Sequence, residues 1–147
     1  MTKFDYVRPP QHFARHHKTL IVIKHYAFTC DNRVYFSDTR YVDLEQHTYQ
    51  LEVELWSKTD DQGMAVDFKE IDAVYNHYLA PKLEGQLIND TLPEMNTTVE
   101  NIAHWIWQQF HAHLPEGVSL NTITLFETPD QGTKLTRNIC LLYTSDA

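Results

Sequence analysis

The sequence predicts an α+β fold, in which an antiparallel β-sheet is covered on one face by a pair of helices. Three observations predict it: β-rich segments at both ends, two amphipathic helical segments between them, and turn residues at the junctions. Strands that are segregated from a pair of helices are typical of this class. The expected order is strand, strand, helix, helix, strand, strand, over residues 19–29, 45–57, 67–80, 97–114, 118–127 and 133–137.

The first two strands are expected from different patterns. Residues 20–28 are rich in β-branched and aromatic side chains. In the second strand, Leu51, Val53 and Leu55 alternate with polar residues, which predicts one buried and one exposed face. Residues 30–43 contain several turn-forming side chains, so we expect turns there around a short strand at 34–36.

Both helices begin at a capping signal. Asp67 is placed to cap the first, and the run Thr97-Thr98-Val99-Glu100 is placed to cap the second. Pro81 is expected to end the first helix, because proline lacks the amide hydrogen that a helix needs. Each helix carries one apolar stripe, formed by Phe68, Ile71, Val74, Tyr75 and Tyr78 in the first and by Val99, Ile102, Ala103, Ile106, Trp107 and Phe110 in the second.

Composition limits the function classes. The 147 residues carry a formal net charge of −8 at pH 7, with no run of Lys and Arg, which argues against a nucleic-acid partner. No apolar run is long enough to span a membrane, and the N-terminus lacks a signal-peptide pattern. Two unpatterned cysteines favour a reducing compartment. We therefore expect a cytoplasmic protein without a nucleic-acid or membrane partner.

The chain divides into three parts. Residues 1–17 are a polar leader without clear periodicity, and residues 18–138 form a single domain. Residues 139–147 differ from the rest and look like a translated sequencing adapter, so we expect this tail to be non-native.

Glu45 and His47 are the first candidates for a functional site. Side chains two apart in a strand point to the same side, so the carboxylate and the imidazole are spaced to bind one cation or share one proton. The alternative is a strand end with two solvated polar side chains.

Further motifs point to a known family. They are the strand segment at 45–49, Gly-x-x-x-Asp-Phe at 63–68, the loop at 83–90, the capped helix at 97–107 and Phe-Glu-Thr at 126–128. In this combination the chain resembles the 6-pyruvoyltetrahydropterin synthase family, which includes the 6-carboxytetrahydropterin synthases of the queuosine pathway.

The resemblance implies a fold and an assembly. The fold is the tunnelling fold, in which four-stranded antiparallel sheets, each backed by two helices, join edge to edge in an oligomeric barrel. An isolated four-stranded sheet leaves unpaired edges that such an assembly would close. By resemblance we expect a homohexamer with its sites at subunit interfaces.

The resemblance also implies how a pterin is bound. Glu127 matches the family's glutamate that accepts two parallel hydrogen bonds from the guanidine-like edge of the pterin. Thr98 matches a threonine that adds a hydroxyl contact, whereas Glu100 is expected to cap the helix.

The implied metal site is altered. The family holds zinc with three histidines, and here the matching positions are His47, Glu45 and Asn32, with Asp31 and His25 as alternatives. We expect zinc to be bound, if at all, by these residues.

The implied proton-transfer residues are altered too. Glu84 is the expected catalytic base, but Gly85 stands where the family has a histidine and Tyr41 where it has the catalytic cysteine. Cys30 is expected to be a buried structural thiol.

Three functions follow from the resemblance. The first is a lyase acting on 7,8-dihydroneopterin triphosphate, with a product shifted toward side-chain cleavage by the variant site. The second is a catalytically degenerate paralogue that binds pterins without synthase activity. The third is a purely structural oligomer.

Overall fold

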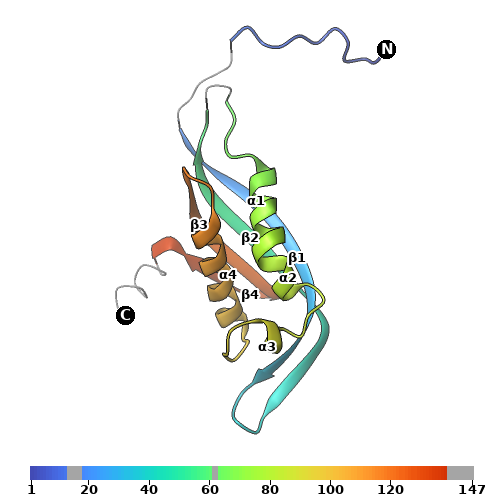
Figure 1. Ribbon diagram of the computed structural model, residues 1–147, viewed down its shortest axis with the longest axis vertical. Coiled ribbons are helices and arrows are strands. Elements are labelled where there is room, and N and C mark those ends of the chain that lie inside the picture. Colours follow the sequence, from blue (N-terminus) through green and yellow to red (C-terminus); the bar gives the residue numbers. More distant parts are fainter. Residues whose placement is uncertain (13–17, 61–62, 139–147) are drawn as a thin grey trace.

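The protein is a two-layer α+β domain in this computed structural model, which describes residues 1–12, 18–60 and 63–138. The sheet is a four-stranded antiparallel meander in the order β1-β2-β3-β4, and helices cover one of its faces (Figure 1). The predicted class and strand order are confirmed. The predicted tail at 139–147 and part of the leader, residues 13–17, lie outside the described residues. The strands are β1 Thr19–Tyr35, β2 Tyr41–Lys58, β3 Val118–Thr128 and β4 Gln131–Thr136.

The first two strands form a longer hairpin than the sequence predicted. β1 and β2 pair from Thr19↔Lys58 as far as Tyr35↔Tyr41, so the turns expected over residues 30–43 reduce to one turn at the hairpin tip. This end of the hairpin projects beyond the helical layer, at the bottom of Figure 1. The turn-forming side chains misled the prediction because several of them pair as strand residues.

Polar groups from a distant part of the chain stabilise the outer edge of this projecting segment. The Asn89 side chain accepts a hydrogen bond from the Arg33 amide (2.8 Å) and donates one to the Arg33 carbonyl (2.9 Å). Asn96 makes the same pair of bonds to Tyr35, at 3.0 and 2.7 Å. Each side-chain amide thus replaces one residue of a neighbouring strand, and it satisfies backbone groups that would otherwise remain unpaired.

The first helical segment continues past Pro81, so the prediction that Pro81 ends it is wrong. α1 (Phe68–Val74) leads into a π-helical turn, η1 (Tyr75–Leu79), and then into α2 (Ala80–Leu83). In the π turn the Ala80 amide bonds to the carbonyl of Tyr75, five residues back. The wider turn removes the need for an α-type bond at proline and makes room for its ring.

The second helical segment forms as predicted but is capped one residue later. After a short α3 (Ile88–Thr91), α4 (Val99–His113) begins at Thr98, whose hydroxyl oxygen accepts a hydrogen bond from the Asn101 amide (3.2 Å). Asn101 therefore occupies the position expected of Glu100, and the Glu100 side chain is not needed for the cap.

The core lies between the sheet and the helices. The expected alternation of β2 is confirmed, because Leu51, Val53 and Leu55 are buried. The stripe of α4 is confirmed except at Val99, which is partly buried, whereas Phe68 and Tyr78 of the first stripe are exposed. α4 packs against β3 and β4, and α2 and α3 contact the β1 edge. None of the helices in the described residues is both long and apolar enough to span a lipid bilayer.

We expect Asn89→Ala to lower the free energy of unfolding by about 1–3 kcal/mol, because two partly buried hydrogen bonds to Arg33 are lost. Chemical denaturation measures the change, and hydrogen exchange should show faster exchange of the Arg33 amide. Asp90→Ala is the matched control, since Asp90 is exposed on the same short helix. Equal stability of the two variants would contradict the edge-pairing role of Asn89.

Candidate functional site

A cavity of about 220 Å³ lies between the β1–β2 hairpin and the start of α4. Its apolar wall comes from both strands of the hairpin, and its polar groups come from three different elements. Glu127 of β3 and Thr98 of the α4 cap both line it, so the structure brings the two predicted substrate-binding residues together. The full lining is Val34, Phe36, Val42, Leu44, Tyr49, Thr98, Val99, Glu100 and Glu127.

Glu127 sits at a β-bulge. Phe126 pairs with Gly132 and Thr128 with Gln131, so β3 has one residue more than β4 at this point. The strands approach closely here, because a Cβ atom on Gly132 would lie 2.6 Å from the Leu125 carbonyl oxygen. Bulges redirect single side chains and are frequent beside functional sites. The glycine thus permits the backbone geometry that places Glu127 at the cavity.

His47 holds this bulge in place. Its Nε2 lies 2.5 Å from the backbone carbonyl oxygen of Glu127. A carbonyl can only accept, so Nε2 carries the hydrogen and donates it. The imidazole edge also contacts the Tyr49 ring, with centroids 4.8 Å apart. His47 therefore joins β2 to β3 and contacts two residues that line the cavity, Tyr49 and Glu127.

A second bulge separates Glu45 from His47. Asn32 pairs with Leu44 and Cys30 with His47, so β2 has one residue more than β1 between these pairs. Leu44 and His47 consequently share a face, and Glu45 leaves the strand on the other one. The expectation that Glu45 and His47 share a face is wrong, because the strict alternation it assumed is interrupted.

The bulge has a clear local cause. Gln46 adopts a positive φ of 46°, and its amide donates a hydrogen bond to the Asp31 carboxylate (2.7 Å). Asparagine and aspartate adopt this conformation more readily than glutamine does, so sequence alone gives little sign of it.

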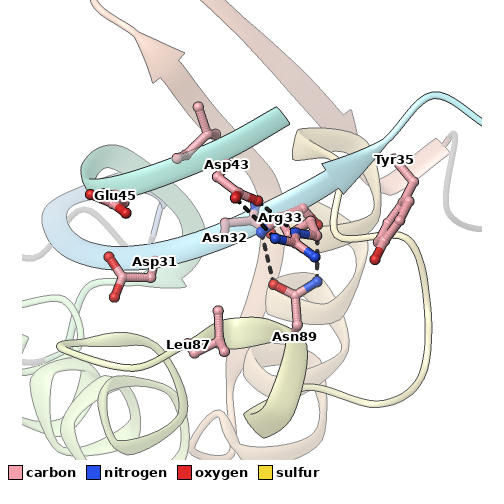
Figure 2. A pocket seen from close by; sticks show the side chains of 9 residues that line it. Asp31, Asn32, Arg33, Tyr35, Asp43, Glu45, Leu87 and Asn89 are labelled. Carbon is pink, nitrogen blue, oxygen red and sulfur yellow. Dashed lines mark hydrogen bonds and ion pairs between the residues drawn. The ribbon is translucent and has the colours of Figure 1, made fainter. Parts of the chain in front are cut away.

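Glu45 instead lines a second cavity of about 470 Å³, shown in Figure 2. Its carboxylate and that of Asp31 lie toward one end, and Arg33 pairs with Asp43 beside them (Figure 2). The Arg33–Asp43 pair is bidentate, at 2.6 and 3.0 Å. This pairing raises the pKa of Arg33 and lowers the pKa of Asp43.

Asn32 is buried and engaged on both sides of its amide. Its nitrogen donates to the Tyr49 hydroxyl (3.0 Å) and to the Thr97 carbonyl (2.8 Å), and its oxygen accepts from the Thr97 hydroxyl. Burial raises the pKa of Tyr49 to about 12, although the Asn32 hydrogen bond opposes the shift. Tyr49 is therefore a neutral phenol at physiological pH.

The three predicted zinc ligands do not converge in this structure. Glu45 lies on the face opposite His47, and the Asn32 amide is already paired. No group of three or more histidine, cysteine or acidic side chains is placed to hold a metal ion in the part of the chain that is described. The residues present therefore do not fit a zinc site within one chain, and zinc binding stays a prediction.

The predicted base, Glu84, lies outside both cavities. Its carboxylate accepts a hydrogen bond from the Thr29 amide (3.0 Å) at the edge of β1. Cys30 is buried as expected, and its pKa is raised to about 12 by burial and then by the charges of Asp31 and Glu84. Burial is also the main cause that raises the pKa of Tyr75, to about 12. The exposed Tyr41 ring instead contacts the Arg33 guanidinium, 3.9 Å from the ring centre.

Comparisons with known proteins agree with this architecture. A family model described as 6-pyruvoyl tetrahydropterin synthase matches residues 21–138. A dihydroneopterin monophosphate aldolase from Pyrococcus furiosus is 30% identical over 93 residues, which is 63% of this chain and 78% of that protein.

Two solved structures are similar in fold. The 6-pyruvoyl tetrahydropterin synthase of Caenorhabditis elegans gives a TM-score of 0.70 at 16% identity, covering 82% of this chain and 96% of that one. The enzyme of Plasmodium vivax gives 0.62 at 14% identity, covering 82% and 98%. These likenesses confirm the tunnelling fold.

We expect native Cys30 to resist alkylation at pH 8, because a thiol with a pKa of about 12 supplies very little thiolate. In a Cys140→Ser variant, where Cys30 is the only cysteine, iodoacetamide should react on the order of 10³-fold more slowly than with the same chain in denaturant. Mass spectrometry measures both rates. Native and denatured rates within tenfold of each other would contradict the buried, protonated thiol.

Proposed function

The chain belongs to the 6-pyruvoyl tetrahydropterin synthase family, and from that membership we propose that it binds a reduced pterin beside Glu127 and cleaves its side chain. The substrate class is a phosphorylated 7,8-dihydroneopterin. The observation that carries the proposal is that Glu127 and Thr98, which come from separate elements, line one cavity. The proposal places the protein in pterin metabolism.

The lining of the cavity supports a pterin ligand. Val34, Val42 and Leu44 supply apolar surface for a flat heterocycle. The Glu127 carboxylate is free to accept hydrogen bonds, since no described residue donates one to it. A carboxylate binds a guanidine-like edge through two parallel, charge-assisted hydrogen bonds, which gives both affinity and orientation.

We favour side-chain cleavage over the usual synthase reaction. Gly85 has no titratable group where a synthase has a histidine, and the predicted zinc ligands diverge. The relative from Pyrococcus furiosus is an aldolase for dihydroneopterin monophosphate, so a cleaving reaction exists among relatives of this chain. We therefore place the substrate in the phosphorylated dihydroneopterin class, with the triphosphate and the monophosphate as the two candidates.

Aldol-type cleavage requires a base and no redox partner. The base removes the proton of the 2′-hydroxyl, the C1′–C2′ bond breaks, and its electron pair passes into the imine of the ring. The products are a phosphorylated two-carbon aldehyde and, after protonation at C1′, a 6-hydroxymethyl dihydropterin. Glu84 is the predicted base, and Glu100 is the second carboxylate that lines the cavity.

We also propose that the protein acts as a homohexamer. The outer edge of β1 is covered only from Thr29 to Tyr35. The loop at residues 85–86 and the side chains of Asn89 and Asn96 cover it there. Residues 19–27 form an edge that no described segment pairs, and Ile21 and Ile23 are exposed beside it. The cavity of about 220 Å³ is smaller than the roughly 300 Å³ of the smallest complete ligand sites, so a neighbouring subunit would complete it.

The runner-up is a pterin-binding paralogue without activity. It is favoured by the position of Glu84, which lies outside the cavity and is bonded to the Thr29 amide. Both functions require the same pterin contact at Glu127 and differ only in turnover.

We expect Glu127→Gln to weaken pterin binding about 10- to 100-fold, because a charge-assisted pair of hydrogen bonds is lost. Titration calorimetry with 7,8-dihydroneopterin measures the change. Glu116→Gln is the control, since Glu116 is exposed and does not line the cavity. Equal affinities of the two variants would contradict the pterin site.

Turnover separates the two functions. We expect incubation with dihydroneopterin monophosphate or triphosphate to yield a 6-hydroxymethyl dihydropterin on chromatography, and Glu84→Gln or Glu100→Gln to reduce the rate about 100-fold. Pterin binding without any product would favour the paralogue. Metal analysis of the same sample tests the zinc prediction, since zinc lost in His47→Ala would support it.

A further inference from the structure

We infer that Tyr49 donates a hydrogen bond to the ligand in the Glu127 cavity and thereby selects a 4-oxo pterin over a 4-amino one. Tyr49 lines the cavity together with Glu127, yet neither the motifs nor the family membership assigned it a role. The inference rests on the proposed pterin site and names the group at that site which recognises the oxo edge.

The orientation of Asn32 determines what Tyr49 can do. The Thr97 carbonyl can only accept, so the end of the Asn32 amide that faces it must be the NH₂ group, and the Asn32 oxygen accepts from the Thr97 hydroxyl. That group has two hydrogens, and both are used: one on the Thr97 carbonyl at 2.8 Å and one on the Tyr49 hydroxyl oxygen at 3.0 Å. The Tyr49 oxygen is therefore an acceptor toward Asn32.

The hydroxyl hydrogen of Tyr49 must then point elsewhere. No described residue accepts it, although the Tyr49 side chain is 1% exposed. The ring itself cannot swing away, because it stacks on Phe28 with centroids 5.2 Å apart and meets the edge of His47 at 4.8 Å. A buried donor without an acceptor is costly, so a group inside the cavity is its natural acceptor.

Two of the polar groups that line the cavity, Glu127 and Tyr49, are complementary to one ring edge. Glu127 only accepts hydrogen bonds when ionised, and Tyr49 has one hydrogen to donate. A 2-amino-4-oxo pyrimidine ring presents N–H donors next to a carbonyl acceptor, which matches this pair. In a 2,4-diamino ring the carbonyl is replaced by an NH₂ donor, which would face the Tyr49 hydrogen. Sites built around a hydrogen bond reject analogues that cannot make it.

Asn32 acquires a positioning role in this arrangement. It does not touch the ligand, because its amide is fully paired with Thr97 and Tyr49. It fixes which way the Tyr49 hydroxyl donates. Thr97 in turn fixes Asn32, so the selectivity depends on a buried chain of three polar side chains.

The test compares 2-amino-4-oxopteridine with 2,4-diaminopteridine on Tyr49→Phe, which keeps the ring and removes only the hydroxyl. We expect wild-type protein to bind the 4-oxo compound more tightly. Tyr49→Phe should weaken binding of the 4-oxo compound about 5- to 20-fold and change binding of the diamino compound less than twofold. Tyr75→Phe is the matched control, since Tyr75 is buried but does not line the cavity.

Asn32→Asp provides a second variant in case Tyr49→Phe does not fold, because it leaves Tyr49 intact and replaces the NH₂ donor by a carboxylate oxygen that can accept the Tyr49 hydrogen. It should also reduce the preference for the 4-oxo compound. Unchanged affinities in Tyr49→Phe, or an equal loss for both compounds, would overturn the role of Tyr49 while leaving the pterin site standing. If wild-type protein binds neither compound, the proposed function itself fails.

Discussion

The hydrogen bond from His47 to the Glu127 carbonyl is the interaction on which the cavity depends. It joins β2 to β3 where both strands depart from regular pairing, and it fixes the backbone at Glu127, which lines the cavity. Regular strands would place these residues by alternation alone. Two bulges and one imidazole place them here instead, and the glycine at 132 allows the strands to approach closely enough.

The projecting hairpin provides the apolar wall of the cavity, and amide side chains hold its edge. Asn89 and Asn96 pair with the backbone of Arg33 and Tyr35, and Asn32 connects the same strand to Tyr49. Neutral amides suit this task because they satisfy both a donor and an acceptor without bringing a charge out of water. Asn32, which stands at the position of a predicted metal ligand, thus has a structural role in this chain.

The sequence predicted the fold well where patterns are local. The alternation of β2 and the stripe of α4 depend on neighbouring residues, so they could be recognised without a structure. Glu127 and Thr98 were found through motifs, and the structure places them on one cavity. Pro81 was misjudged because a π-helical turn has no sequence signature.

The positions of the other site residues could not be predicted, because they depend on the register of the strands. One additional residue in β2 separates Glu45 from His47, and a contact from Asp31, distant in sequence, stabilises that bulge. The importance of Tyr49 is likewise invisible in the sequence, because it comes from an amide orientation that Thr97 sets from across the fold.

A crystal structure of the protein with bound 7,8-dihydroneopterin tests the central claim most directly. The ring should lie against Val34 and Leu44, with its amino edge on the Glu127 carboxylate and its 4-oxo group within hydrogen-bonding distance of the Tyr49 hydroxyl. A ligand bound instead in the larger cavity beside Asp43 and Glu45, or a cavity at Glu127 closed by its own side chains, would contradict it.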